Sequence, residues 1–499
     1  MAAAVLAGLM SVAVNSATGA EKVAAAESPK NEEMKMSRED KDQATLKSTT
    51  PEAQRGTAGV NPGEALPGWL NAKTFGAKGD LQAIIDAETI KGSPVLKSAA
   101  GRFKPTDVGK LCTVDKAISN TVSLYTVIVS WQSTNQVTLR DAAGVSVTNA
   151  GAIWGTDDTK AIQAAIDEID VRGGGTIYFP PGTYYIHGSP GGAHGENAQL
   201  RLPSVGSPTG RFVPITFLGA CRPVMAVPRR LADNCGGSML FSDCESDGNA
   251  SMIGARGPVS MNAAAGWPFL SNVFPHFENL AVSITDFRTI HNGAPFGPSI
   301  TALNMFDVQA ASTRNVVVQY RAPNYHTAGN PWCGKNPPIS YPNAAGIKFP
   351  QVLNNINNTA EGDLMAIGFP TGVVVSELFC GFRVQAAGCY TGLFIGPSSH
   401  SLVIQNVVSQ WNHFGIAITE TPILPKMMIS SYSVEVNAPE QNVPGWEETP
   451  AWTGNGDDYH DPKDSGRGLI YYCAYNRGFV NLRITNGGKP KITIKRLDE

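Results

Sequence analysis

The chain has 499 residues and a formal net charge of −3, and only 16% of its residues are charged. Such a balance excludes the strongly basic footprint of a nucleic-acid-binding protein. The 52 glycines and 34 prolines follow no Gly-X-Y period, which favours a turn-rich β protein over a collagen or a helical bundle. At this length an ordinary chain would hold about two to four domains, whereas a solenoid grows by repetition.

Residues 1–26 contain a short apolar run, Ala2 to Val14, followed by small residues such as Ala24-Ala25-Ala26. This pattern predicts a signal peptide and a secreted or periplasmic protein, and the run is too short to span a membrane. No Lys or Arg precedes it, so a disordered Ala-rich tail is the alternative. Residues 27–63 are polar and charged, with no aromatic residue before Trp69, and are expected to form a linker.

Residues Asp157 to Ile186 organise the rest of the chain. Thr156, Asp157 and Asp158 are expected to accept hydrogen bonds from the free N–H groups of a helix start. An apolar stripe then recurs at helical spacing, and Gly173-Gly174-Gly175 ends the helix. Two β-rich segments follow, 176–179 and 183–186, with a Pro-Pro-Gly turn between them.

The order of these segments resembles the start of the pectate-lyase-like family of right-handed parallel β-helices. The motifs are FGAKGD at residues 75–80, DDTKAIQAAID from Asp157, and GGGTIYFPPGTYYI ending at Ile186. The resemblance implies an all-β fold, a single-stranded right-handed parallel β-helix with an N-terminal capping helix. Residues 64–80 would start the cap, residues 156–499 would form the β-helix, and a loop at 437–467 would interrupt it. The family includes polysaccharide lyases, glycoside hydrolases, epimerases and phage tailspikes.

Residues 81–155 interrupt the family pattern with strand-like segments separated by turns. This pattern predicts that residues 81–155 form an inserted small β module. The module either packs on the cap or binds sugar through Tyr125 and Trp131. Downstream, an aromatic residue, a glycine and a short apolar strand recur around Gly372, Gly392 and Gly415. Glycines 20 and 23 residues apart match the length of one coil of a β-solenoid.

The eight cysteines include no CxxC pair, so no zinc cluster is expected. An even number in an exported protein permits disulfides, and Cys221, Cys235 and Cys244 are close enough in sequence to share one loop. Buried thiols in a β-helix core are the alternative.

The segment Trp411 to Ile418 resembles the histidine-bearing strand of polygalacturonases, with His413 in the place of the active-site histidine. Gly388-Cys389-Tyr390 stands where those enzymes carry a paired Asp-Asp, so their mechanism is not supported. His413 is therefore either catalytic or a structural histidine, and Trp411 beside it is a candidate sugar-binding residue.

Glycoside hydrolysis needs two carboxyl groups, and the candidates near the repeated coils are Glu377, Glu420 and Asp363. Glu377 and Glu420 each lie five residues after the repeat glycine, two coils apart, which predicts a separation of roughly 10 Å. Surface glutamates at turns are otherwise simply solvated. Arg383, in the coil between them, could hold a sugar carboxylate.

The 437–467 loop carries three aromatic residues, Trp446, Trp452 and Tyr459, among several carboxylates. Aromatic rings stack on sugars, so the loop is either a substrate-binding lid or an acidic surface insertion.

Together these features predict an exported carbohydrate-active enzyme that cleaves glycosidic bonds of a polysaccharide. Hydrolysis is slightly favoured over β-elimination, and no cofactor or metal is expected unless a lyase binds Ca²⁺. The alternative is a phage tailspike or surface adhesin that binds polysaccharide. A monomer is favoured, with a homotrimer if the chain is tailspike-like, and no nucleic-acid partner is expected.

Overall fold

The computed structural model describes residues 68–119, 122–188, 198–203, 212–224, 231, 236–243, 250–255, 261–262, 267–268, 273–285, 300–306, 308, 310–321, 345–350, 358–376, 378–389, 391–396, 402–410, 412, 414–418, 427–435, 470–472, 480–484 and 495–496. The predicted signal peptide, the linker and the 437–467 loop lie outside these residues.

Two parallel sheets dominate the described part of the chain. The first sheet follows the order β1 (Trp69–Asn71), β8 (Gly175–Phe179), β11 (Val213–Gly219), β16 (Val273–Glu278), β19 (Ser312–Tyr320), β21 (Asn358–Ile367), β23 (Phe379–Ala387), β25 (Leu402–Gln410), β27 (Met427–Glu435) and β29 (Val480–Ile484), joined by β9 (Gly182–Ile186), β12 (Ser238–Ser242) and β17 (Leu280–Ile284). The second runs β10 (Ala198–Leu202), β13 (Ala250–Ala255), β18 (Ile300–Asn304), β20 (Ala345–Lys348), β22 (Thr371–Val375), β24 (Thr391–Ile395), β26 (Phe414–Ile418), β28 (Ile470–Tyr472) and β30 (Lys495–Arg496).

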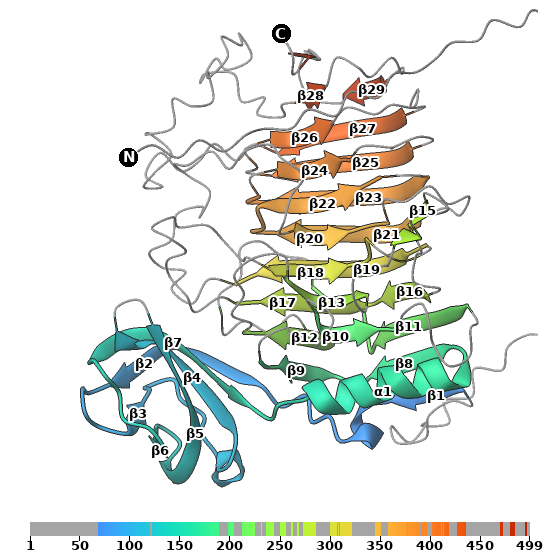
Figure 1. The fold of residues 1–499 in the computed structure, drawn as a ribbon. Helices are drawn as coiled ribbons and strands as arrows, with labels where there is room; N and C mark the ends of the chain where they lie inside the picture. The colour runs from blue at the N-terminus through green and yellow to red at the C-terminus, as the bar shows by residue number, and fades with distance from the viewer. Residues whose placement is uncertain are drawn as a thin grey trace, which may run out of the picture. The chain divides into compact units, whose positions relative to one another are not determined.

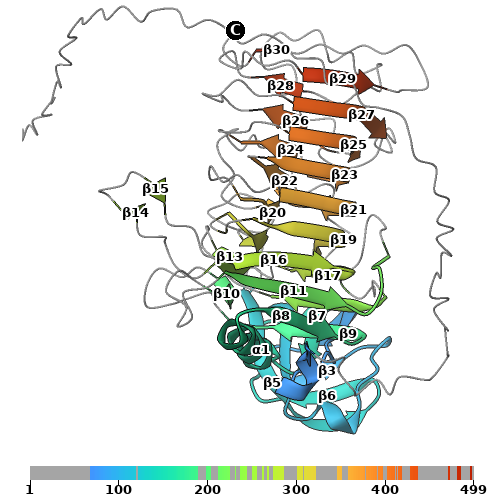
Figure 2. The same ribbon diagram turned by 90° about the vertical axis from the view of Figure 1, so that its right-hand side faces the viewer.

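From β18 onward each strand of the second sheet is followed by a strand of the first, and successive turns of chain stack as coils of a parallel β-helix (Figures 1 and 2). In the coils before β18, two strands of the first sheet, such as β11 and β12, precede each strand of the second. The prediction of an all-β fold with parallel sheets is confirmed. The repeat glycines occupy neighbouring coils, because Thr371 pairs with Thr391 and Thr391 with Phe414. A Cβ on Gly372 would lie 2.6 Å from the Gly392 carbonyl oxygen, so this position requires glycine.

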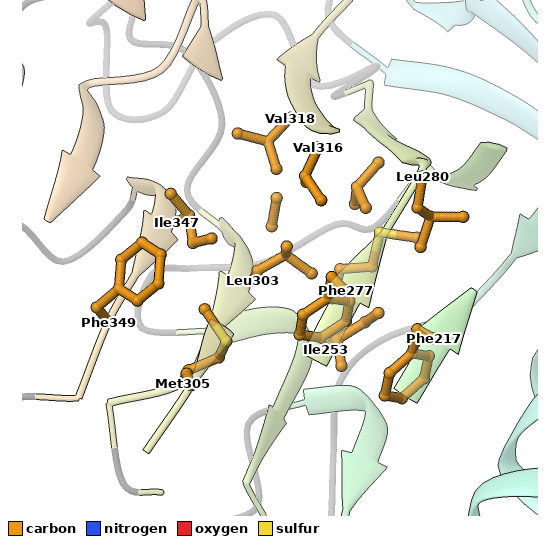
Figure 3. Packing of buried hydrophobic residues seen from close by; sticks show 14 of the residues in the cluster. Phe217, Ile253, Phe277, Leu280, Leu303, Met305, Val316, Val318, Ile347 and Phe349 are labelled. Carbon is orange, nitrogen blue, oxygen red and sulfur yellow. The ribbon is translucent and has the colours of Figure 1, made fainter. Parts of the chain in front are cut away.

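The interior of the coils is a continuous apolar core (Figure 3). Phe179, Phe217 and Phe277 come from three consecutive strands of the first sheet and stack, with ring centroids 6.3 and 4.8 Å apart. All three side chains have no exposed surface. Since one coil cannot bury its own inward face, this stack joins each coil to its neighbours.

Helix α1 (Thr159–Arg172) packs against the same core through the predicted apolar stripe, including Ile162, Ile166 and Ile169. Asp157 Oδ1 accepts a hydrogen bond from the Thr159 N–H at 3.0 Å, as expected of a residue at the helix start. The prediction that Asp158 also caps the helix was wrong, because its side chain makes no capping hydrogen bond. Its carboxylate instead accepts backbone N–H bonds from Lys78, Gly79 and Tyr185.

Six antiparallel strands between residues 82 and 155 close into a barrel. They are β2 (Gln82–Thr89), β3 (Val95–Lys97), β6 (Gln136–Leu139), β5 (Val122–Ser133), β4 (Leu111–Ser119) and β7 (Val147–Gly155). The short elements η1 (Ala72–Phe75), η2 (Pro105–Asp107) and the β14–β15 pair (Met261–Asn262, Trp267–Pro268) complete the described structure. Inside the barrel, the Trp154 ring packs on Phe103 and its Nε1 donates to Asp107 at 3.0 Å.

Lys110 of the barrel joins this region to the FGAKGD segment. Its Nζ lies 2.8 Å from both Asp80 and Asp107. Asp80 also accepts hydrogen bonds from the backbone and hydroxyl of Thr156. These contacts hold the two ends of the barrel segment, Asp80 and Thr156, together and tie them to Lys110.

Candidate functional site

Polar side chains follow one another along the outward face of the first sheet, on strands β16, β19, β21 and β23. They define the charged stripe, whose members are His276, Glu278, Ser312, Arg314, Glu361, Asp363 and Arg383. The stripe arises because side chains alternate across a strand, so each coil buries one set of residues and presents the other to solvent. In β16 the burial pattern alternates in this way, with Phe274, His276 and Glu278 facing outward.

The register places these residues in columns that run from coil to coil. Glu278 is level with Arg314 and Arg314 with Glu361. His276 is level with Ser312, and its Nδ1 lies 2.7 Å from the Ser312 hydroxyl. Since neighbouring strands lie about 4.8 Å apart, Glu278 and Glu361 are separated by roughly 10 Å along the coil axis.

Two of the predicted site residues, Asp363 and Arg383, meet in the stripe. They are partners in the β21–β23 register, and Arg383 Nη1 lies 3.8 Å from Asp363 Oδ1. Arg222, which follows β11, contacts the other carboxylate oxygen of Asp363. Both oxygens of this carboxylate therefore face arginines.

The Glu278 carboxylate also has partners in the stripe. Its Oε1 lies 3.7 Å from Arg314 Nη1, and its Oε2 lies 3.4 Å from His276 Nε2. Among the described stripe residues, Glu361 is the carboxylate that makes no hydrogen bond or ion pair. The described part of the stripe therefore does not provide the two free carboxyl groups that hydrolysis needs.

Aromatic side chains lie beside the charged ones. Phe382 on β23 is 55% exposed, and Phe212 is 61% exposed and packs edge-on against Phe274 of β16, with ring centroids 5.5 Å apart. Exposed rings of this kind offer apolar faces to a sugar ring. The outward surface thus combines flat apolar groups with arginines and carboxylates.

The other predicted site residues lie outside the described residues, so their roles stay predictions. They are Glu377, Glu420, His413, Trp411, Trp446, Trp452 and Tyr459. The sequence patterns did not single out His276, Glu278 or Arg314 as site residues. These residues could be identified only from the register between β16 and β19, whose paired residues are 36 positions apart. Loops of irregular length hide that register in the sequence.

Four cysteines are described, and all are free thiols. Cys112 and Cys389 are buried, and burial raises the pKa of each thiol to about 12. Both fit the buried-thiol alternative. Cys221 is exposed, and its predicted partners Cys235 and Cys244 lie outside the described residues.

Within the described ranges, no group of three or more His, Cys, Asp or Glu side chains is arranged to hold a metal ion. No helix there has the length and apolar character needed to cross a membrane.

Comparison with known proteins gives one family and one curated relative. Residues 145–193 match the model "Rhamnogalacturonase A/epimerase, pectate lyase-like". The chain is 33% identical over 105 residues to Mannuronan C5-epimerase AlgE3 of Azotobacter vinelandii. That alignment covers 20% of this chain and only 6% of the relative.

Two solved structures are similar at 12% identity, both A-modules of Azotobacter vinelandii mannuronan C-5 epimerases. For AlgE4 the likeness covers 56% of this chain and 86% of that chain with a TM-score of 0.20, and for AlgE6 it covers 56% and 84% with a TM-score of 0.16. The family match falls on β7, α1, β8 and β9, which include two of the three motifs that carried the resemblance. Residues 145–193 are thus similar to the pectate-lyase-like family.

Proposed function

We propose that this protein is an exported carbohydrate-active protein that binds an acidic polysaccharide along the charged stripe and acts on its glycosidic bonds. One observation carries the proposal: polar side chains recur at matching positions on consecutive strands of the outward face. A repeating polymer laid along the coils would meet a repeating set of groups. The family model and the curated relative, whose name describes an enzyme acting on mannuronan, support the same substrate class.

The arginines of the charged stripe favour binding of an acidic polymer over a neutral one. Arg314 and Arg383 have 55% and 40% exposed side chains. A guanidinium group binds carboxylates through paired N–H donors, and a partly exposed one can exchange a protein partner for a ligand. Sugar carboxylates could therefore take up the outward donors of both residues, while Phe382 packs against a ring between them.

Hydrolysis depends on a carboxyl pair that the described stripe does not supply, since Asp363 and Glu278 are ion-paired. Hydrolysis stays the proposed mode of cleavage, with Glu377 and Glu420 as the predicted pair. In the same proposal the chain is a right-handed single-stranded β-helix, α1 caps it, and the barrel is an inserted module. Export follows from the predicted signal peptide.

The test is binding and cleavage of a panel of polysaccharides by the purified chain, acidic and neutral polymers side by side. Binding is followed by retardation in gels that contain each polymer, and cleavage by new reducing ends together with absorbance of unsaturated uronates. We expect retardation by at least one acidic polymer, and Arg383→Gln should weaken it about tenfold, because one charged hydrogen bond contributes about 1.5–3 kcal/mol. Arg172→Gln, on the exposed face of α1, is the matched control.

New reducing ends without that absorbance would establish hydrolysis, and absorbance would establish β-elimination. Binding without either product would place the protein with adhesins and tailspikes. Absence of binding to every acidic polymer would refute the proposal.

A further inference from the structure

A cavity of about 430 Å³ lies where the barrel meets the first coils, and no residue of the charged stripe lines it. One wall is the chain from Leu81 to Ile85, at the start of barrel strand β2. The coils contribute Thr183 of β9, and Met239 and Phe241 of β12. Its volume falls within the range of roughly 300–1,000 Å³ that is typical of ligand sites. We call it the barrel–coil cavity.

The walls of the barrel–coil cavity are held in place by packing between the barrel and the coils. A cluster of buried apolar side chains joins the two parts, and its members are Leu81, Ile153, Tyr185, Leu231, Met239, Phe241 and Ala281. Four of these residues, Leu81, Leu231, Met239 and Phe241, also line the cavity. The Leu81 N–H donates to the Thr183 carbonyl oxygen at 3.0 Å, which fixes the start of the barrel against β9. The cavity is therefore formed before any ligand binds, which lowers the cost of binding.

The lining suits an apolar ligand body better than a sugar ring. Leu81, Met239 and Phe241 offer no oxygen or nitrogen atom to a ligand hydroxyl. The Gln82 side chain also lines the cavity, but its Nε2 already donates to the Leu81 carbonyl oxygen at 3.1 Å. A buried hydroxyl without a hydrogen-bond partner is unfavourable, so a sugar with several hydroxyls would bind poorly here.

Two arginines give the barrel–coil cavity a positive charge. Arg321 directly follows β19 and is 1% exposed. Its Nη1 donates to the Leu231 carbonyl oxygen at 3.2 Å, and its guanidinium carbon lies 6.0 Å from the centre of the Phe241 ring. A guanidinium group stays protonated in proteins, even when it is buried.

Arg102 lies on the barrel side of the cavity and is exposed. Within the described ranges, its side chain makes no hydrogen bond or ion pair, so all its N–H donors are open to a ligand. Among the described residues that line the cavity, none is acidic. An anionic group would therefore meet two positive charges and no negative one, and a carboxylate matches the paired donors of a guanidinium group.

We propose that the barrel–coil cavity binds a small amphipathic anion, an organic acid with an apolar body. Arg102 holds the carboxylate, and the apolar body packs against Leu81, Met239 and Phe241. Because such a ligand touches both the barrel and the coils, its binding stabilises their junction. The inference goes beyond the proposed function, since neither the charged stripe nor a polysaccharide takes part.

The experiment is titration calorimetry of the full chain with three acids, phenylbutyrate, indolepropionate and isocaproate. Each acid is compared with its primary amide, which has the same body without the charge. We expect at least one acid to bind with a Kd of about 1 mM or tighter, and its amide to bind about tenfold more weakly, through loss of a charged hydrogen bond.

Hydrogen exchange measured by mass spectrometry locates the bound acid. Peptides that cover residues 81–85 and β12 should exchange more slowly when the acid is present, because they form opposite sides of the cavity. Peptides from β25, which does not line the cavity, should be unchanged.

Three variants test the role of each part of the site. Arg102→Gln should weaken binding of the acid about tenfold and leave binding of the amide unchanged, and Arg102 is exposed, so the variant should fold normally. Ala100→Trp should abolish binding of both compounds, because Ala100 is exposed, lines the cavity and would fill it with an indole ring. Lys97→Gln removes another exposed cation of the barrel that does not line the cavity, and it should match the wild type.

Three results would overturn the inference. They are absence of binding by all three acids, equal affinity for each acid and its amide, and an equal loss of acid binding in Arg102→Gln and Lys97→Gln. No polysaccharide is present in these measurements, so each of these results would leave the proposed function of the stripe standing. Loss of polymer binding in Arg383→Gln, in turn, concerns the stripe alone.

Discussion

Removing the central ring of the aromatic stack should destabilise the first coils far more than removing an exposed ring. Phe217 has no exposed surface and lies between Phe179 and Phe277, with centroids 6.3 and 4.8 Å away. Truncation of a buried phenylalanine to alanine costs about 3–5 kcal/mol, which includes both lost ring contacts and the cavity left behind. Phe217→Ala should therefore lose about that much. Phe382→Ala, at 55% exposure, should lose less than about 0.5 kcal/mol.

Hydrogen exchange measured by mass spectrometry is the appropriate assay, because a solenoid need not unfold in one step. At about 1.4 kcal/mol per tenfold change, amide protection in peptides from β8, β11 and β16 should fall at least 100-fold in Phe217→Ala. Peptides from β25 should change much less, since only neighbouring coils share the stack. A fall of less than tenfold in β11, or an equal fall in Phe382→Ala, would refute this account of the core.

Three other predictions concern the junction between the FGAKGD segment, the barrel and β9. Lys110→Gln should destabilise the protein by about 1–3 kcal/mol near neutral pH, because Asp107 is buried and loses its cation. Burial alone would raise the pKa of Asp80, but Lys110 and Thr156 outweigh it and lower that pKa. The stabilisation is thus present above about pH 4 and lost in acid, so urea midpoints of the two proteins should converge as the pH falls. For Asp158, burial raises the pKa to about 6 from 3.8 despite three backbone donors. The folded state then binds the proton more tightly than the unfolded chain, and the wild type should gain stability relative to Asp158→Asn as the pH falls from 6 to 4; a constant difference in urea midpoint would contradict this. Gly182→Ala should lower the melting temperature markedly, because Gly182 has φ +154° and a Cβ there would lie 2.6 Å from the Gly79 carbonyl oxygen. Gly92→Ala, at φ +77° with open space around it, controls for backbone strain alone.

Local patterns were sufficient for the parts of the fold that depend on neighbours in sequence. The apolar stripe at Ile162, Ile166 and Ile169 predicted a helix because those residues share one face. The spacing of Gly372, Gly392 and Gly415 predicted the coil length, because the three glycines lie on neighbouring strands of the second sheet. A Cβ on Gly372 would meet the backbone of the next coil.

Side-chain roles depended on contacts that sequence distance conceals. Asp158 has the composition and position of a helix cap, but its carboxylate binds N–H groups 79 and 80 residues earlier. His187 and Asp243 are 56 residues apart and meet only because β9 and β12 pair in register. Loops of unequal length separate the coils, so no fixed spacing in the sequence identifies such pairs.

The charged stripe itself was only partly predictable. Asp363 and Arg383 were singled out separately, one as a candidate catalytic acid and one as a candidate sugar-binding residue. Their pairing follows from a register shift between Ala360 and Asp363 that aligns the two residues. A bulge of this kind leaves no clear signal in the sequence.

Binding of an acidic polysaccharide to the outward face of the coils can be measured directly. The most direct measurement is affinity electrophoresis of the wild type, Arg383→Gln and Arg172→Gln in gels containing acidic or neutral polymers. We expect retardation of the wild type and of Arg172→Gln by at least one acidic polymer, and about tenfold weaker retardation of Arg383→Gln. Equal migration of all three proteins in every acidic gel would contradict it.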